Sequence, residues 1–305
     1  MSSGKTRRES LKQFAAATGV GVGTTAMASA PSAAAKRELD LSDPIKALET
    51  RVKMMGSLNN ETVTSFMRLN VYGDPHDGNF VPLFTMNNLV VDTWERVAED
   101  TFELTKYEAG FYTKFDSHET IDTFDNPWTG ETIDIFNFRL GPVNREYTPN
   151  EIIAMAFAPE PLPLEVIGDR VFLATQSMAE TQTMFPRERF PIEGSHSNTE
   201  YLNSFMTYSA SYDDIVNPDI ASAPVHMQIQ NKLGWAPWMR MRGREGGSSL
   251  RGFGTKIASI DELPQYVIDG FAERVPEILD TPNWEEPVFE TFDYLRYLEE
   301  KKAKG

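Results

Sequence analysis

Long stretches in which apolar and polar residues alternate constrain the fold of this 305-residue chain more than any other feature. One long stretch covers residues 101–115, where Tyr107, Ala109 and Phe111 recur at every second position. A period of two is that of a β-strand, whose successive side chains point to opposite faces of a sheet. Further stretches of this kind cover residues 67–72, 80–97, 132–138, 171–185, 202–212, 225–233 and 250–257. The pattern predicts about eight or nine strands, several of them long.

Turn-forming residues separate these stretches, and few helical patterns lie between them. Gly73-Asp74-Pro75, Asn126-Pro127 and Gly246-Gly247 are examples of such turns. Without helices to form crossovers, consecutive strands pair antiparallel. Closing a sheet of long strands into a barrel hides its edges. We therefore expect a mainly β fold: a large antiparallel β-barrel of calycin-like form, with an N-terminal helix and C-terminal helices.

The helical patterns of the folded part lie near its two ends. Ser42-Asp43-Pro44 is typical of a helix start, and apolar residues at steps of three and four continue the pattern to about Leu58. Ser259-Ile260-Asp261-Glu262 has the form of a capping box, which predicts a helix from there to about Leu279. A last helical pattern covers residues 290–302.

Residues 1–35 have the features of an export signal. Thr6-Arg7-Arg8-Glu9-Ser10-Leu11-Lys12 resembles the twin-arginine signal, with Ser10 where Phe is usual. A weakly apolar stretch follows, and Ala33-Ala34-Ala35 fits signal peptidase. The alternative is a membrane anchor, for which the stretch is short and rich in glycine. We expect a signal peptide over 1–35 and a single β-barrel domain over 36–305, with a helical segment from about residue 259.

Charge and cysteine content exclude several classes of function. The formal net charge is −16, and a chain this acidic repels the phosphates of nucleic acids and anionic lipids. It has no cysteine, which excludes disulfides, thiolate metal sites and a cysteine nucleophile. We expect a periplasmic or secreted protein that meets the twin-arginine export machinery, binds no nucleic acid and has no stable membrane insertion once mature.

Familiar cofactor and metal motifs are missing from the sequence. It contains no glycine-rich nucleotide loop, no G-x-S-x-G and no H-E-x-x-H. The four histidines, His76, His118, His196 and His226, all lie more than five residues apart, so no local histidine pair can bind a metal. We expect no cofactor and no local metal site, although a site assembled from distant strands stays open.

Two strands carry a half-polar face that is a candidate cavity wall. In residues 225–230, His226, Gln228 and Gln230 alternate with apolar residues. In the 171–185 strand, Gln176 and Glu180 share a face with methionines. Amides that orient a ligand and methionines that adapt to its shape suit a binding cavity. The alternative is an ordinary face in contact with solvent.

The same face supplies candidate catalytic residues. His226 with Glu180 or Tyr208 would make an acid–base pair if these side chains meet in the interior. Gln176 and Gln228 would then bind the ligand.

Aromatic and basic residues add further ligand-binding candidates. Trp235 and Trp238 lie beside Met239 and Met241 and either line a pocket for an apolar ring or plug the end of the barrel. Arg187 lies in Phe185-Pro186-Arg187-Glu188-Arg189-Phe190 and either clamps an anionic ligand group or forms internal ion pairs.

Three features together resemble a known family. They are Asn126-Pro127-Trp128-Thr129-Gly130-Glu131, Trp235-Ala236-Pro237-Trp238-Met239 and the capped helix near the C-terminus. In this order they are similar to the DUF1838 family of bacterial and fungal proteins, over most of residues 45–300. The resemblance implies no mechanism, because the family has no assigned catalytic residues.

Three functional hypotheses follow from the sequence. The first is an exported barrel protein that binds a small apolar or aromatic molecule in its interior. The second is a cofactor-independent lyase, isomerase or hydrolase that uses an acid–base pair in the same cavity. The third is a structural partner protein of the cell envelope.

Overall fold

The structure is a computed structural model that describes residues 38–75, 79–154, 160–180, 201–241, 243–280 and 288–289, together with four residues between 297 and 303. The signal peptide expected over 1–35 lies outside the described residues and stays a prediction. From Leu39 onward the chain forms one folded unit.

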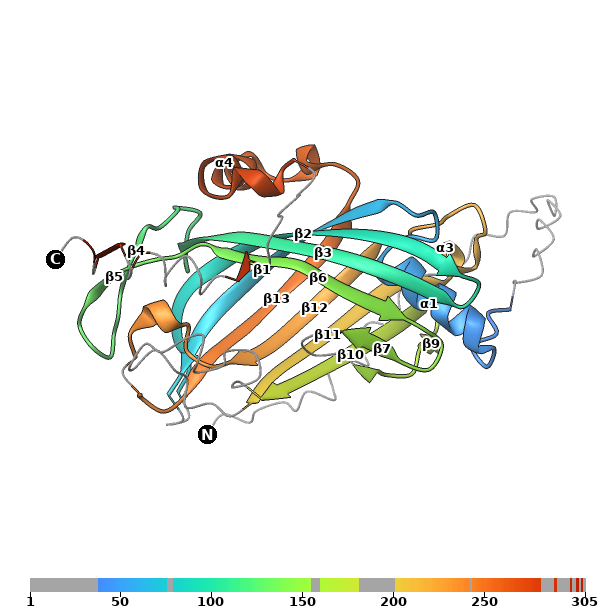
Figure 1. Cartoon of the computed structure of the whole chain (residues 1–305), viewed down its shortest axis with the longest axis horizontal. Helices are drawn as coiled ribbons and strands as arrows, with labels where there is room; N and C mark the ends of the chain where they lie inside the picture. The colour runs from blue at the N-terminus through green and yellow to red at the C-terminus, as the bar shows by residue number, and fades with distance from the viewer. Residues whose placement is uncertain are drawn as a thin grey trace, which may run out of the picture. The chain divides into compact units, whose positions relative to one another are not determined.

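About half of the described residues of this unit belong to one antiparallel sheet, which curls into a half-barrel (Figure 1). Ten strands follow one another in the order β14-β6-β3-β2-β1-β13-β12-β11-β10-β8, with β7 beside β6 and β9 beside β10. In chain order, the first strands of this sheet are β1 (Thr62–Asp74), β2 (Val81–Ala98), β3 (Thr101–Lys114), β6 (Phe138–Tyr147) and β7 (Ile152–Ala154). The later strands are β8 (Glu160–Pro161), β9 (Glu165–Ile167), β10 (Arg170–Glu180), β11 (Tyr201–Ser211), β12 (Val225–Leu233), β13 (Gly247–Ile257) and β14 (Val288–Phe289). A separate pair is formed by β4 (Thr123–Asp125) and β5 (Thr132–Asp134).

The prediction of a mainly β fold is confirmed. The predicted barrel is only half formed within the described part of the chain. Among the described residues, the strands at the two ends of the order, β14 and β8, do not pair with each other. Each is two residues long, too short to offer a ladder that would close a sheet of strands up to 18 residues long.

The strand β6 was not predicted from the sequence. Gly141 and Pro142 lie in its middle, and such a pair is normally typical of a turn. β6 pairs with β3 on both sides of an irregularity between Lys106 and Glu108, so the sheet accommodates the proline at a bulge. The predicted strand at 132–138 divides into β5 and the first residue of β6.

Glycines in β13 help the sheet to curl. The side-chain position of Gly252 faces the neighbouring strand β1 so closely that a Cβ would overlap the carbonyl oxygen of Arg68. Only glycine allows this approach, and glycines at such positions let a sheet bend sharply.

Helix α1 (Pro44–Met55) covers one end of the curled sheet (Figure 1). Its N-terminus is capped by Asp43, whose Oδ1 accepts from the backbone N of Ile45 at 2.9 Å. Lys53 donates from Nζ to the carbonyl oxygens of Ile215 and Asn217 at 2.8 and 2.6 Å, which ties α1 to the short helix α3 (Tyr212–Val216). On its other side α1 packs against β2, β3 and β6.

The predicted helix over 259–279 is divided into three pieces. Its pieces are the 3₁₀ turns η2 (Ile260–Glu262) and η3 (Pro276–Ile278) and, between them, helix α4 (Gln265–Arg274). Pro264 and Pro276 stand at the two breaks, because proline cannot continue a helix. Helix α4 covers the convex face of the sheet, where Phe271 meets Phe111 edge to face at 5.1 Å (Figure 1). None of the described helices is long and apolar enough to cross a bilayer.

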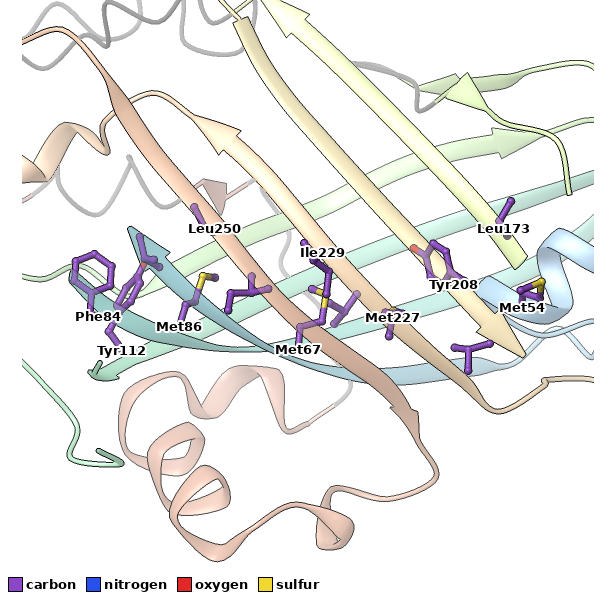
Figure 2. Close-up of a cluster of buried hydrophobic side chains, with 14 of the residues drawn as sticks. Met54, Met67, Phe84, Met86, Tyr112, Leu173, Tyr208, Met227, Ile229 and Leu250 are labelled. Carbon is purple, nitrogen blue, oxygen red and sulfur yellow. The ribbon is translucent and has the colours of Figure 1, made fainter. Parts of the chain in front are cut away.

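The largest hydrophobic core lies on the concave face of the sheet. Figure 2 shows many of its side chains, which come from α1 and from strands on both halves of the sheet. The labelled residues are Met54, Met67, Phe84, Met86, Tyr112, Leu173, Tyr208, Met227, Ile229 and Leu250. Methionine is therefore a main component of the interior.

Candidate functional site

Strand β12 shows which face of the sheet points inward. Val225, Met227 and Ile229 are 1%, 4% and 2% exposed and lie in the concave core. His226 and Gln228 are exposed on the convex face. The sequence predicted the alternation correctly but assigned the polar face to the interior, whereas burial of the apolar face contributes more to stability.

The structure does not bring His226 and Tyr208 together as the predicted acid–base pair requires. In the register of β11 and β12, Tyr208 lies opposite Met227, and His226 lies opposite Ser209. Neighbouring residues along a strand point to opposite faces, so the sheet separates the imidazole from the phenol. Tyr208 alone of the two faces the interior, where it is 7% exposed.

The other predicted residues divide between the convex face, the barrel end and the part of the chain not described. Gln176 lies opposite Phe205, which lies opposite Gln230, so Gln176 shares the convex face with His226 and Gln228. Glu180 ends β10, and its side chain lies outside the described residues, as does Arg187.

The two predicted tryptophans have different roles. Trp238 is 1% exposed and packs against Phe84 and Tyr112, with ring centroids 5.8 and 6.1 Å away, so it plugs the end of the core. Trp235 lies behind Trp128, with ring centroids 5.0 Å apart. Trp128 lines a depression of about 450 Å³ together with Thr129, Met241, Gly243 and Arg244.

A stripe of polar residues that the sequence analysis missed crosses the concave face. We call Asn88, Asp92, Lys106 and Glu108 the polar stripe. Asp92 on β2 lies opposite Lys106 on β3. The Nζ atom of Lys106 is 3.1 Å from Oε1 of Glu108 and 3.9 Å from Oδ1 of Asp92. Asn88 donates from Nδ2 to Oε2 of Glu108 at 3.3 Å. The carboxylates of Asp92 and Glu108 thus both lie near the largely buried ammonium group of Lys106. The charges of Arg145 and Lys256 also act on Asp92.

Burial changes the ionisation of the polar stripe. It raises the pKa of Asp92 to about 6, because desolvation penalises the carboxylate more than Lys106 stabilises it, and Glu108 adds repulsion. Burial alone would lower the pKa of Lys106, but the charges of Asp92 and Glu108 outweigh it, and the pKa is raised. Asp92 therefore exchanges its proton closer to neutral pH than an ordinary aspartate, beside a lysine that stays charged.

Tyr208 faces the polar stripe from the other half of the sheet. Burial raises the pKa of its phenol, and the charges of Lys106 and Asp92 act on it across the interior, although four strands lie between β3 and β11 in the sheet order. Within the described part of the chain, the hydroxyl group donates to Sδ of Met206, at 3.8 Å. A thioether is a weak acceptor, so this buried hydroxyl has little of the hydrogen bonding it would have in water.

Two buried acceptors of the polar stripe have no hydrogen-bond partner among the described residues. They are Oδ1 of Asn88 and Oδ1 of Asp92, on side chains that are 1% and 9% exposed. An unpaired buried polar atom costs about 1–3 kcal/mol. Both atoms are acceptors, so the group that would satisfy them is a hydrogen-bond donor.

Methionine side chains fill the space beside the polar stripe. A Cβ added to Gly110 would lie 3.0 Å from Cε of Met86, and one added to Gly254 would lie 3.3 Å from Cε of Met227. Met67 also packs over Gly254. We call Met67, Met86 and Met227 the methionine wall. Unbranched thioether side chains change rotamer easily, so this wall adapts more readily than one built of branched residues.

The sequence of the chain matches a known protein family. Residues 68–297 match the family described as "Protein of unknown function (DUF1838)". The chain belongs to the DUF1838 family. The match confirms the resemblance seen in the sequence. It covers the polar stripe, both tryptophan segments and, of the methionine wall, Met86 and Met227. No curated protein matches the chain.

In this DUF1838 chain, one feature of the sequence could have revealed the polar stripe. The middle of β2 is buried on both faces and contains the polar residues Thr85, Asn87, Asn88 and Asp92 among apolar ones. A polar residue in a strand covered on both sides has no solvent face to occupy, whichever way the alternation falls. Among the described residues, no group of histidine, aspartate and glutamate side chains could hold a metal ion.

Proposed function

We propose that this protein binds a small apolar or aromatic molecule carrying a hydroxyl group in the concave interior of a calycin-like curled sheet. The observation that carries the proposal is the pair of buried acceptors, Oδ1 of Asn88 and Oδ1 of Asp92, beside the methionine wall.

The polar stripe favours a neutral hydroxyl over a charged group. Lys106 is already shared by Asp92 and Glu108, so an anionic ligand would compete with two carboxylates for one ammonium group. A hydroxyl donates one hydrogen bond to a carboxylate without adding a charge to the interior, and such bonds contribute about 1.5–3 kcal/mol.

The methionine wall supports the apolar part of the ligand. Met67, Met86 and Met227 come from three different strands and offer flexible thioether surface on one side of the polar stripe. An aromatic ring of the ligand that displaces these methionine side chains gains dispersion contacts with their sulfur atoms and excludes water from the site.

A pair of probes tests the proposal. By titration calorimetry, 2-naphthol should bind at least tenfold more tightly than 2-methoxynaphthalene, which has the same ring and no donor. In Asp92→Asn the acceptor loses its charge, so this preference should fall to a few-fold, while His226→Ala on the convex face should keep it. Equal affinities for the two probes, or no binding of 2-naphthol, would overturn the proposal.

The second candidate is an acid–base enzyme, a lyase, isomerase or hydrolase that works without a cofactor. It is favoured by the raised pKa of Asp92, about 6, which suits a group that takes up and releases protons near neutral pH. In this version Asp92 and Tyr208 replace the pair predicted with His226. A substrate turned over with a pH–rate limb near 6 that disappears in Asp92→Asn would support it, and an unchanged limb would exclude it.

The proposed location is the periplasm or the exterior, reached through twin-arginine export. Replacing Arg7 and Arg8 by lysine should leave uncleaved precursor in the cytoplasm, and an unchanged exported yield in a fractionation experiment would contradict this signal.

A further inference from the structure

We propose that the depression beside Trp128 is a second binding site, separate from the concave interior, and that it takes a planar aromatic anion. It is lined by Trp128, Thr129, Met241, Gly243 and Arg244 and has a volume of about 450 Å³. Trp238, which plugs the end of the concave core, is not among the lining residues.

One wall of the depression is held by a buried asparagine. Oδ1 of Asn126 accepts from the backbone N of Trp128 at 2.9 Å and of Thr129 at 3.2 Å. Its Nδ2 donates to the carbonyl oxygen of Met239 at 2.9 Å. Asn126 is 1% exposed, so its amide locks the turn that carries Trp128 onto the segment that carries Trp238.

The indole of Trp128 has a fixed position. It lies over Gly73 in β1, where a Cβ would overlap the ring, and the Trp235 ring packs behind it at an interplanar angle of 59°. Trp128 itself is only partly buried. A rigid aromatic surface that stays accessible is a good platform for a flat ring, because little side-chain entropy is lost on binding.

The opposite wall is a turn that presents an arginine. Nε1 of Trp235 donates to the carbonyl oxygen of Arg244 at 3.1 Å. The backbone N of Arg244 donates to the carbonyl oxygen of Met241 at 3.0 Å. Gly243 between them has φ of +74° and no side chain to fill the depression. The Arg244 side chain is exposed and forms no ion pair within the described part of the chain.

The chemistry of these walls selects the ligand. A ring stacked on Trp128 would also contact the thioether of Met241, and its anionic group would reach the guanidinium of Arg244. Guanidinium groups bind carboxylates through two parallel hydrogen bonds, and an accessible arginine in a chain of net charge −16 is free to do so. The interior site, in contrast, takes a neutral hydroxyl.

The experiment compares 2-naphthoate with its neutral analogue 2-naphthamide by titration calorimetry, using the full-length protein. The wild type should bind 2-naphthoate at least tenfold more tightly than 2-naphthamide. Arg244→Gln should abolish this preference, and its exposed position leaves folding unaffected. The matched control is Arg251→Gln, an exposed arginine stacked on Phe80 at 4.6 Å, which should keep the preference.

Two results would overturn this inference: no binding of 2-naphthoate by the wild type, or equal affinity of the wild type and Arg244→Gln. Asp92→Asn should leave 2-naphthoate binding unchanged. Failure here is therefore distinguishable from failure of the interior site, which is tested with 2-naphthol.

Discussion

The two faces of the curled sheet carry polar residues for different reasons. On the convex face over β12, His226 and Gln228 are in contact with solvent, where a polar side chain costs no desolvation. On the concave face, Asp92 and Lys106 are largely withdrawn from solvent, and a charged partner must offset the desolvation of each. Polar residues on the convex face are therefore no evidence of a binding site, whereas polar residues buried on the concave face indicate one.

Removing the shared ammonium group should have the largest effect. Lys106→Met removes the cation that lies closest to the carboxylates of Asp92 and Glu108. The charges of Arg145 and Lys256 still act on Asp92, so the free energy of unfolding should fall by about 3 kcal/mol in urea titrations at pH 7. Lys114→Met is the control, because Lys114 and its partner Glu119 are half exposed or more, and it should cost at most about 1 kcal/mol. Similar losses in both variants would show that the polar stripe is not desolvated.

The next effect concerns the pH dependence of stability. The pKa of Asp92 is about 6 in the folded protein against 3.8 for the free side chain, so folding favours its protonated form. Its contribution to stability is complete below pH 4 and is lost as the pH rises through 6, by up to about 3 kcal/mol. Asp92→Asn should therefore flatten the curve of unfolding free energy between pH 4 and 7.

The exposed Asp116 provides the control for this measurement. Asp116→Asn should keep the wild-type curve. A curve that stays equally steep in Asp92→Asn would mean that another group titrates.

A smaller effect is expected from the phenol that faces the polar stripe. Tyr208→Phe removes a hydroxyl whose acceptor among the described residues is a sulfur at 3.8 Å, so the free energy of unfolding should change by less than about 1 kcal/mol. Binding of 2-naphthol should weaken by about three- to tenfold, because the hydroxyl shares the interior with the ligand. Tyr212→Phe, whose hydroxyl accepts from the backbone N of Leu39 at 3.1 Å, should leave binding unchanged. If both variants bind alike, Tyr208 does not face the ligand.

The smallest effect belongs to the convex face. His226→Ala should change stability by less than about 0.5 kcal/mol and leave 2-naphthol binding unchanged, since exposed substitutions away from special features rarely do more. Weakened binding would place the ligand on the convex face and reverse the comparison of the two faces.

The alternation of apolar and polar residues predicted the strands well, because it depends only on residues that are close together in the sequence. The boundaries of β12 agree with the predicted 225–233, and β13 begins three residues earlier than predicted, at Gly247. The strand β6 was missed because Gly141 and Pro142 have turn chemistry that the pairing with β3 overrides.

The site was predicted less well because it depends on which face curls inward. Alternation groups His226 with Gln228 equally well whether that face is concave or convex. The choice depends on the apolar side chains of the opposite face, such as Met227, which pack in the concave core. The polar stripe is also assembled by pairing between β2 and β3, and spacing along one strand does not reveal it.

Methionine methyl groups offer the most direct test of the interior site. Protein labelled with ¹³C at the methionine methyl groups is titrated with 2-naphthol and followed by ¹H–¹³C correlation spectra, with each resonance assigned by a Met→Leu variant. We expect saturable shifts at Met67, Met86 and Met227, which form the methionine wall, and none at Met241 in the depression beside Trp128. Shifts confined to Met241, or unchanged resonances of the methionine wall at saturating 2-naphthol, would contradict binding in the concave interior.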